Sequence, residues 1–107
     1  MTTGIMSMLD MLKESGIDLL YFVDPIQDNV VMNEFKQKIN SAFAVAGGVN
    51  SGVTLAKGDV NDVKDAVYSA IKALGPDRFI LSPVDALFPD TPEQSFSAMV
   101  QAWQEMI

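Results

Sequence analysis

Three short apolar runs, separated by longer amphipathic stretches, constrain the fold of this chain more than any other feature. The runs cover residues 17–23, interrupted only by Asp18, and residues 42–46 and 79–81. They lack the alternation of a strand with one face in water and are typical of parallel strands buried on both faces. Because parallel strands are joined by crossovers that usually contain a helix, the sequence predicts an α/β fold. The expected order is helix, strand, helix, strand, helix, strand, helix.

The amphipathic stretches predict four helices, because apolar residues recur in them every three to four positions. They cover residues 5–12, 30–39, 60–74 and about 91 to the C-terminus. Gly16, Asn40 and Gly75-Pro76 are stop signals for the first three helices. Asp59 is expected to cap the start of the third helix.

Glycine and proline define the two remaining segments. Residues 47–52 contain three glycines, so the second strand is expected to end at Ala46 and to open into a glycine-rich loop, followed by a helical turn at residues 54–56. Thr91 is expected to be the N-cap residue of the last helix, with Pro92 in its first turn. The inward face of that helix is predicted to hold Phe96, Met99, Val100 and Trp103.

The chain contains no cysteine and no histidine. It therefore lacks thiolate nucleophiles, disulfides, imidazole bases and the usual zinc ligands, and any metal would need oxygen ligands. Fourteen acidic and seven basic residues give a net charge of -7, which argues against a nucleic acid partner. No signal-peptide pattern and no apolar run of the roughly 20 residues that span a membrane is present. A cytoplasmic location with no membrane partner is expected.

A three-stranded parallel sheet of this kind cannot bury all of its apolar surface with its own helices. Its strands are apolar on both faces, so a single layer of helices leaves one face in water, and its two edges are open. The strands can belong to a larger barrel, or the chain can pair with copies of itself. A self-sufficient two-layer sandwich is the third option.

The loops after the strands resemble those of a known family. Residues 80–93, with Pro89-Asp90-Thr91-Pro92 among them, resemble the closing strand, loop and helix start of the uroporphyrinogen decarboxylase superfamily, which includes cobalamin-dependent methyltransferases. Residues 12–18 followed by Asp24-Pro25 resemble its sixth strand and the helix before it, and residues 46–58 resemble its seventh strand and loop. The resemblance implies a (β/α)8 TIM barrel. Residues 1–107 would be the C-terminal part of that barrel domain, with strands six to eight and their helices.

The same resemblance bears on chemistry. Methyltransferases of the family hold zinc through a His-x-Cys-Gly motif and a later cysteine, which align with Met1, Thr3 with Gly4, and Asp85. The decarboxylases place a histidine at the position of Asp85, and their arginine-rich substrate grip lies in an N-terminal half that these residues do not resemble. The resemblance therefore implies a chain with no cofactor of its own.

Barrel active sites lie at the C-terminal ends of the strands, which predicts where the functional residues meet. The candidate catalytic residues are Asp85 and Asp24, and the candidate substrate-binding residues are Gly48, Asn50 and Ser82. All of these residues except Ser82 have a structural alternative. Asp24 before Pro25 is also an ordinary turn starter, Gly47-Gly48 is also plain loop geometry, and the carboxylate of Asp85 is also suited to capping a helix or loop.

The function expected from these observations is that of a C-terminal fragment of a uroporphyrinogen decarboxylase-like protein, inactive alone. Its full-length relative would decarboxylate a tetrapyrrole or transfer a methyl group from a corrinoid or methylated substrate. The expected partners are the remaining barrel segment or further copies of the chain, with a small-molecule substrate at the mouth. The alternative is a small non-enzymatic α/β domain that self-associates, and a third option is a stand-alone enzyme in which Asp24 and Asp85 transfer protons.

Overall fold

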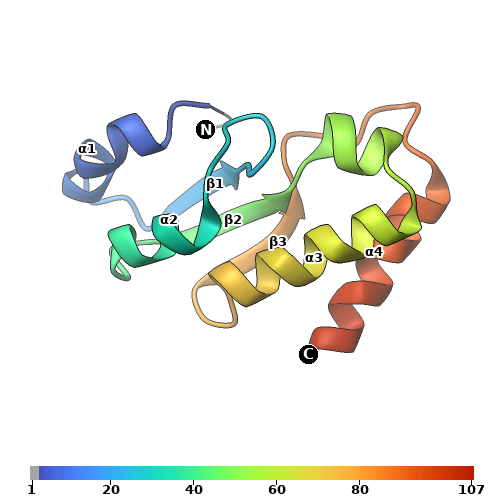
Figure 1. The fold of residues 1–107 in the computed structure, drawn as a ribbon. Coiled ribbons are helices and arrows are strands. Elements are labelled where there is room, and N and C mark those ends of the chain that lie inside the picture. Colours follow the sequence, from blue (N-terminus) through green and yellow to red (C-terminus); the bar gives the residue numbers. More distant parts are fainter. Residues whose placement is uncertain (1–2) are drawn as a thin grey trace.

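The computed structural model describes residues 3–107 and shows a parallel sheet with its helices on one side (Figure 1). The strands β1 (Leu19–Val23), β2 (Ala44–Val49) and β3 (Phe79–Pro83) lie in chain order, and both pairings are parallel. The helical elements are a 3₁₀ turn (Met6–Met8), α1 (Leu9–Glu14), α2 (Met32–Ile39), a π-helical segment (Ser51–Leu55), α3 (Val60–Leu74) and α4 (Glu93–Met106). The predicted α/β fold class and element order are confirmed.

Several local predictions are confirmed in detail. The first strand ends at Val23 as predicted but begins at Leu19 and not at Ile17, and α3 covers the predicted residues 60–74. Asp59 caps α3 through a reciprocal capping box with Asp62. Asn40 ends α2 in the left-handed conformation, at φ +45°. Within residues 3–107, no helix is long and apolar enough to cross a membrane.

The predicted glycine-rich loop after the second strand is wrong, because Gly47 and Gly48 belong to β2. Their φ angles are +131° and +93°. A Cβ atom at Gly47 would lie 2.7 Å from the backbone nitrogen of Val23, and one at Gly48 would lie 2.8 Å from the Cβ atom of Ala70. The two glycines therefore allow β1 and α3 to approach β2 closely, which a sequence window around them cannot reveal.

The predicted start and inward face of the last helix are partly wrong. Its N-cap residue is Pro92, and the buried hydroxyl of Thr91 has no hydrogen-bond partner among residues 3–107. Met99 is buried as predicted, but Phe96 is 43% exposed and Trp103 is 40% exposed. The side of α4 that packs on α3 consists of Ser95, Ala98, Met99 and Ala102. Small residues let two helices approach closely. With these residues against α3, Phe96 and Trp103 lie on other sides of α4 and stay partly exposed.

The two faces of the sheet differ in how they are covered. Leu20, Val45 and Phe79 lie side by side on the face that packs against the helices. The next row, Tyr21, Ala46 and Ile80, lies on the opposite face. Tyr21 is 56% exposed and Ile80 is 53% exposed. One helical layer therefore covers one face of the sheet, as the sequence predicts, and the second face carries exposed apolar side chains. We call this second face the open face.

The close contact between Gly48 and α3 gives a test of the packing. We expect Gly48→Ala to lower the free energy of unfolding more than Gly16→Ala does, by about 1–3 kcal/mol, because the added methyl group overpacks against Ala70. Gly16 is the matched control, since its φ is also positive, at +79°, but its added Cβ atom would meet nothing within 4 Å. Urea unfolding of the two variants measures the difference. Equal losses would mean that only the backbone conformation matters at Gly48.

A polar contact joins α3 to α4 at the surface. The hydroxyl of Tyr68 donates a hydrogen bond to the carboxylate of Glu105, and Lys64 Nζ lies 3.9 Å from the same carboxylate. The hydrogen bond to Glu105, followed by burial and the nearby negative charges of Glu105 and Asp65, raises the pKa of Tyr68 above its usual 10.0. The folded state therefore favours the protonated phenol.

This pKa shift predicts a titration that can be measured directly. In a Tyr21→Phe background, which leaves one tyrosine, the phenolate absorbance of Tyr68 is expected to rise at a pH above 10.0. Adding Glu105→Ala is expected to bring the midpoint down toward 10, whereas Glu14→Ala is expected to leave it in place. Because the folded-state pKa is raised, the stabilisation is present below the unfolded-state pKa and disappears as the pH rises through the folded-state pKa. A midpoint that Glu105→Ala does not move would contradict the contact.

Candidate functional site

The C-terminal ends of β1 and β2 meet through a buried hydrogen bond. Asp24 follows β1 and Asn50 follows β2, and the Nδ2 of Asn50 donates to the Oδ2 of Asp24 over 2.9 Å. Both side chains are buried. The sequence places these two residues at one mouth, and the structure brings them into direct contact there.

Asp24 uses its carboxylate to build the turn after β1. Its Oδ1 accepts hydrogen bonds from the backbone N–H groups of Ile26 over 2.8 Å and Gln27 over 3.1 Å. Together with Asn50, three donors point at this fully buried carboxylate. Side-chain acceptors of this kind are typical of Asp at turn starts. The arrangement supports the structural interpretation of Asp24, and its catalytic role stays a prediction.

Asn50 connects this turn to the segment after β2. Its Oδ1 accepts from the backbone N–H groups of Val53 over 2.7 Å and Thr54 over 3.3 Å, so it caps the π-helical segment. One amide therefore satisfies donors in its own loop and the acceptor at the end of the neighbouring strand. A substrate could bind the Asn50 side chain without displacing these contacts only through the second N–H of Nδ2.

The end of β2 is also tied to the end of β3. The hydroxyl of Ser51 donates to the carbonyl oxygen of Val84 over 2.6 Å, and the N–H of Val84 donates to the carbonyl oxygen of Val49 over 2.8 Å. The sequence-based site prediction does not include Ser51. Its signal is the Asn-Ser pair at the start of a helical segment, with Asn50 as the N-cap and Ser51 as the first residue, where small polar residues commonly satisfy free backbone groups.

The remaining predicted substrate-binding residues lie in different surroundings. Gly48 lies within β2, and its missing side chain leaves room for Ala70 of α3. Ser82 lies opposite Gly48 in β3, and its buried Oγ has no hydrogen-bond partner among residues 3–107. A buried hydroxyl without a partner is costly, and Ser82 shares this condition with Thr91.

Asp85, the strongest candidate in the sequence, is exposed in the loop after β3. Its φ of +62° is left-handed, a conformation that Asp adopts more readily than most residues. The carboxylate of Asp24 binds Asn50 and its own turn in the interior. The two candidate carboxylates therefore lie in different environments, one buried and one exposed. The structure brings Asp24 and Asn50 together and leaves Asp85 facing solvent.

Comparison with known proteins identifies the family. The model of the family described as uroporphyrinogen decarboxylase (URO-D) matches residues 2–106. The chain belongs to the uroporphyrinogen decarboxylase family. A solved structure, described as a methyltransferase from Methanosarcina mazei, superimposes with a TM-score of 0.78 at 26% sequence identity. The match covers 92% of this chain and 28% of that one, so the chain spans less than a third of the methyltransferase. Among curated proteins, the search finds no match.

These findings confirm the resemblance to the uroporphyrinogen decarboxylase and methyltransferase superfamily, and the three parallel strands with their helices are those of a partial TIM barrel. The zinc site of the methyltransferases does not fit the residues present. The chain has no cysteine or histidine, and within residues 3–107 no cluster of three acidic side chains is placed to hold a metal ion. Of the aligned positions, Met1 lies outside the described residues, and Thr3 and Asp85 offer neither a thiolate nor an imidazole.

The Asp24–Asn50 pair predicts a specific rescue. In Asp24→Asn the new side-chain NH2 group faces another donor, which is either the Nδ2 of Asn50 or the backbone N–H groups of the turn. We therefore expect a loss of about 1–3 kcal/mol in unfolding free energy. Asn50→Asp brings two carboxylates together and is expected to cost at least as much. The double variant exchanges donor and acceptor and is expected to recover most of the loss. Urea unfolding of the four proteins measures this coupling.

Asp85→Asn is the control for the change in net charge, because Asp85 is exposed. We expect its effect to stay within about 0.5 kcal/mol. If Asp24→Asn were as mild as this control, or if the exchange recovered nothing, the buried hydrogen bond would not be the link between the strand ends.

Proposed function

We propose that the chain supplies the C-terminal part of a uroporphyrinogen decarboxylase-like barrel, strands six to eight with their helices, and that it is inactive alone. Tetrapyrrole decarboxylation or corrinoid-dependent methyl transfer then belongs to the assembled barrel. The observation that carries the proposal is the open face of the sheet, with Tyr21 and Ile80 more than half exposed. In a (β/α)8 barrel the face opposite the helices points inward and is packed by side chains of the other strands.

The mouth of the sheet supports this proposal. Asp24, Asn50, Ser82 and Asp85 all lie at or just after the C-terminal ends of the strands, where such barrels bind their substrates. Asp24 and Asn50 hold the shape of the mouth through their mutual hydrogen bond. Asp85 is the group we propose to face a substrate, because it is exposed. The hydroxyl of Ser82 is buried and lacks a partner within residues 3–107, so a role for Ser82 in substrate binding requires its surroundings to rearrange.

The chemistry of the assembled barrel depends on groups beyond this chain. A carboxylate such as Asp85 can donate or accept a proton. Neither a thiolate nor an imidazole is available here, because the chain has no cysteine or histidine. We therefore propose that the residues of this chain bind and orient the substrate and that the remaining barrel segment supplies the other reactive groups.

The second candidate function, a non-enzymatic domain that self-associates, rests on the same open face. Two copies could cover the exposed Tyr21 and Ile80 side chains by packing their open faces together. The net charge of -7 works against this association, because identical chains repel each other.

Assays of the purified chain test the proposed function. With uroporphyrinogen, or with a methylated corrinoid and a thiol in the presence and absence of zinc, we expect no turnover, because the chain lacks the metal ligands and most of the barrel. Full-length decarboxylase and methyltransferase members of the family serve as positive controls in their respective assays. Turnover by the chain alone that disappears in Asp85→Asn would overturn the proposal and establish a stand-alone enzyme.

A further inference from the structure

The dipeptide Asn-Ser occurs twice in the chain, at residues 40–41 and 50–51. Asparagine is among the chemically labile residues. A small residue after it leaves the next backbone nitrogen open to reach the side-chain carbonyl carbon, which is the first step of deamidation. Because the two copies share this local sequence, the surrounding structure decides which of them reacts.

The copy at residues 50–51 is held in place by the fold. Asn50 is 5% exposed and Ser51 is 2% exposed. The Nδ2 of Asn50 donates to Asp24, and its Oδ1 accepts from two backbone N–H groups of the segment that follows. The hydroxyl of Ser51 is bound to the carbonyl oxygen of Val84. The side-chain carbonyl of Asn50 cannot turn toward the Ser51 nitrogen unless this region unfolds locally.

The copy at residues 40–41 lies in the turn between α2 and β2, where both residues are exposed. Within residues 3–107, neither the side chain of Asn40 nor the backbone nitrogen of Ser41 makes a hydrogen bond. The φ angles are +45° at Asn40 and +61° at Ser41. This left-handed conformation is unfavourable for residues with a side chain, so rotation of the Asn40 backbone toward the reactive arrangement starts from a costly conformer.

We propose that Asn40 is a modification site of the folded chain, at which water replaces the side-chain amide by way of a cyclic imide. The backbone nitrogen of Ser41 bonds to the Cγ of Asn40. The bond from Cγ to Nδ2 breaks, and Nδ2 leaves as ammonia with the proton of the Ser41 nitrogen. Water then opens the ring at either carbonyl carbon and gives aspartate or isoaspartate, with no change in oxidation state.

The modification changes the connection from α2 to β2 in two ways. Both products place a negative charge at the C-terminal end of α2, where the helix dipole disfavours it. Isoaspartate also adds a carbon to the main chain, three residues before the buried Phe43. The N–H of Ala42 donates to the carbonyl oxygen of Ile39 over 2.9 Å across this turn, and a longer main chain alters that contact. The site therefore links slow chemistry to the packing of α2.

One tryptic peptide reports on both copies of the dipeptide. Trypsin cleaves after Lys38 and Lys57, so residues 39–57 carry Asn40 and Asn50 together. The intact chain is kept at neutral pH in native buffer or in urea and digested at mildly acidic pH, and fragment masses locate the change from amide to acid. In native buffer we expect Asn40 to convert about tenfold faster than Asn50 or more, and in urea we expect rates within about threefold, because the protection is lost. Equal rates in native buffer, or conversion of Asn40 in urea alone, would overturn the proposal.

A variant and a second asparagine test the role of the Ser41 nitrogen. Ser41→Gly suits the positive φ and uncovers the nitrogen, so we expect the rate at Asn40 to rise about threefold or more while Asn50 stays unchanged. Asn29 is the matched control, because it is exposed with a φ of +53° but precedes the branched Val30, whose N–H donates to the carbonyl oxygen of Asp24 over 3.4 Å. We expect Asn29 to stay an amide in native buffer. An unchanged rate in Ser41→Gly, or conversion of Asn29 as fast as Asn40, would contradict attack by the Ser41 nitrogen.

Discussion

A parallel sheet whose strands follow chain order can receive its connecting helices on only one face. Each crossover between neighbouring parallel strands is right-handed, and successive crossovers that advance in the same direction all pass over the same side. The order β1, β2, β3 therefore sets α2 and α3 on one face, with α1 and α4 extending the same layer. Barrels resolve this asymmetry by closing the sheet, so that the second face becomes an interior. In this chain the second face carries Tyr21 and Ile80 in contact with solvent.

The fold was predictable where its causes are local. The periodicity of α3 and its cap at Asp59 lie within one short stretch of sequence, and β1 is a single apolar run. The sequence predicts a loop at Gly47 and Gly48, because glycine is equally typical of a loop and of a place where two backbones approach closely. What decides between the two is contact with Val23 and Ala70, both more than 20 residues away. The buried face of α4 was predicted incorrectly for a similar reason. The small residues Ala98 and Ala102 pack on α3, and the larger Phe96 and Trp103 therefore lie outside this contact.

The candidate site was predictable in its location and less so in its bonding. Parallel strands end at one edge, which was sufficient to place Asp24 and Asn50 together. Which atoms meet depends on the register of β1, which shifts between Tyr21 and Val23 where Phe22 adopts a φ of +72°. A positive φ at a bulky residue is strained and persists only where the surrounding structure fixes it. No pattern in the sequence signals this irregularity, yet it determines how the end of β1 lies against β2.

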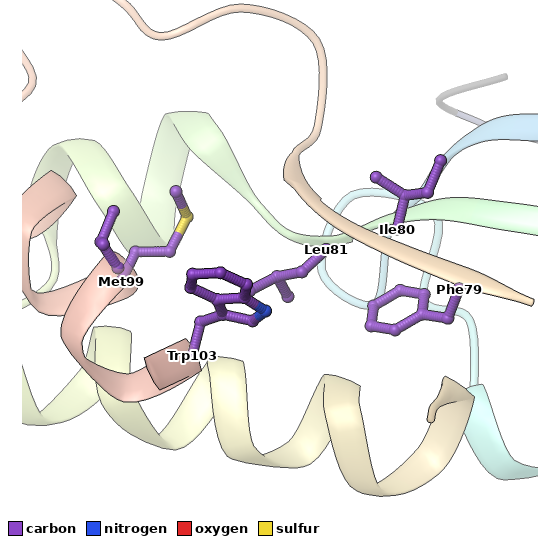
Figure 2. Close-up of a pocket in the computed structure, with 6 residues that line it drawn as sticks. Phe79, Ile80, Leu81, Met99 and Trp103 are labelled. Atoms are coloured by element: carbon purple, nitrogen blue, oxygen red, sulfur yellow. The ribbon is translucent and has the colours of Figure 1, made fainter. Parts of the chain in front are cut away.

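The hydrogen bonds at the mouth are distributed unevenly over the strands: the polar groups after β1 and β2 are paired, and a buried hydroxyl of β3 is not. At the ends of β1 and β2 the carboxylate of Asp24 and the amide of Asn50 satisfy each other and the turns that follow. At β3 the buried hydroxyl of Ser82 finds no partner within residues 3–107. Beside the same strand lies a cavity of about 430 Å³ between Phe79, Ile80 and Leu81 of β3 and Met99, Val100 and Trp103 of α4 (Figure 2). The polar group without a partner and the partly uncovered apolar side chains thus belong to one strand, β3, which pairs with β2 on one side only in the described sheet.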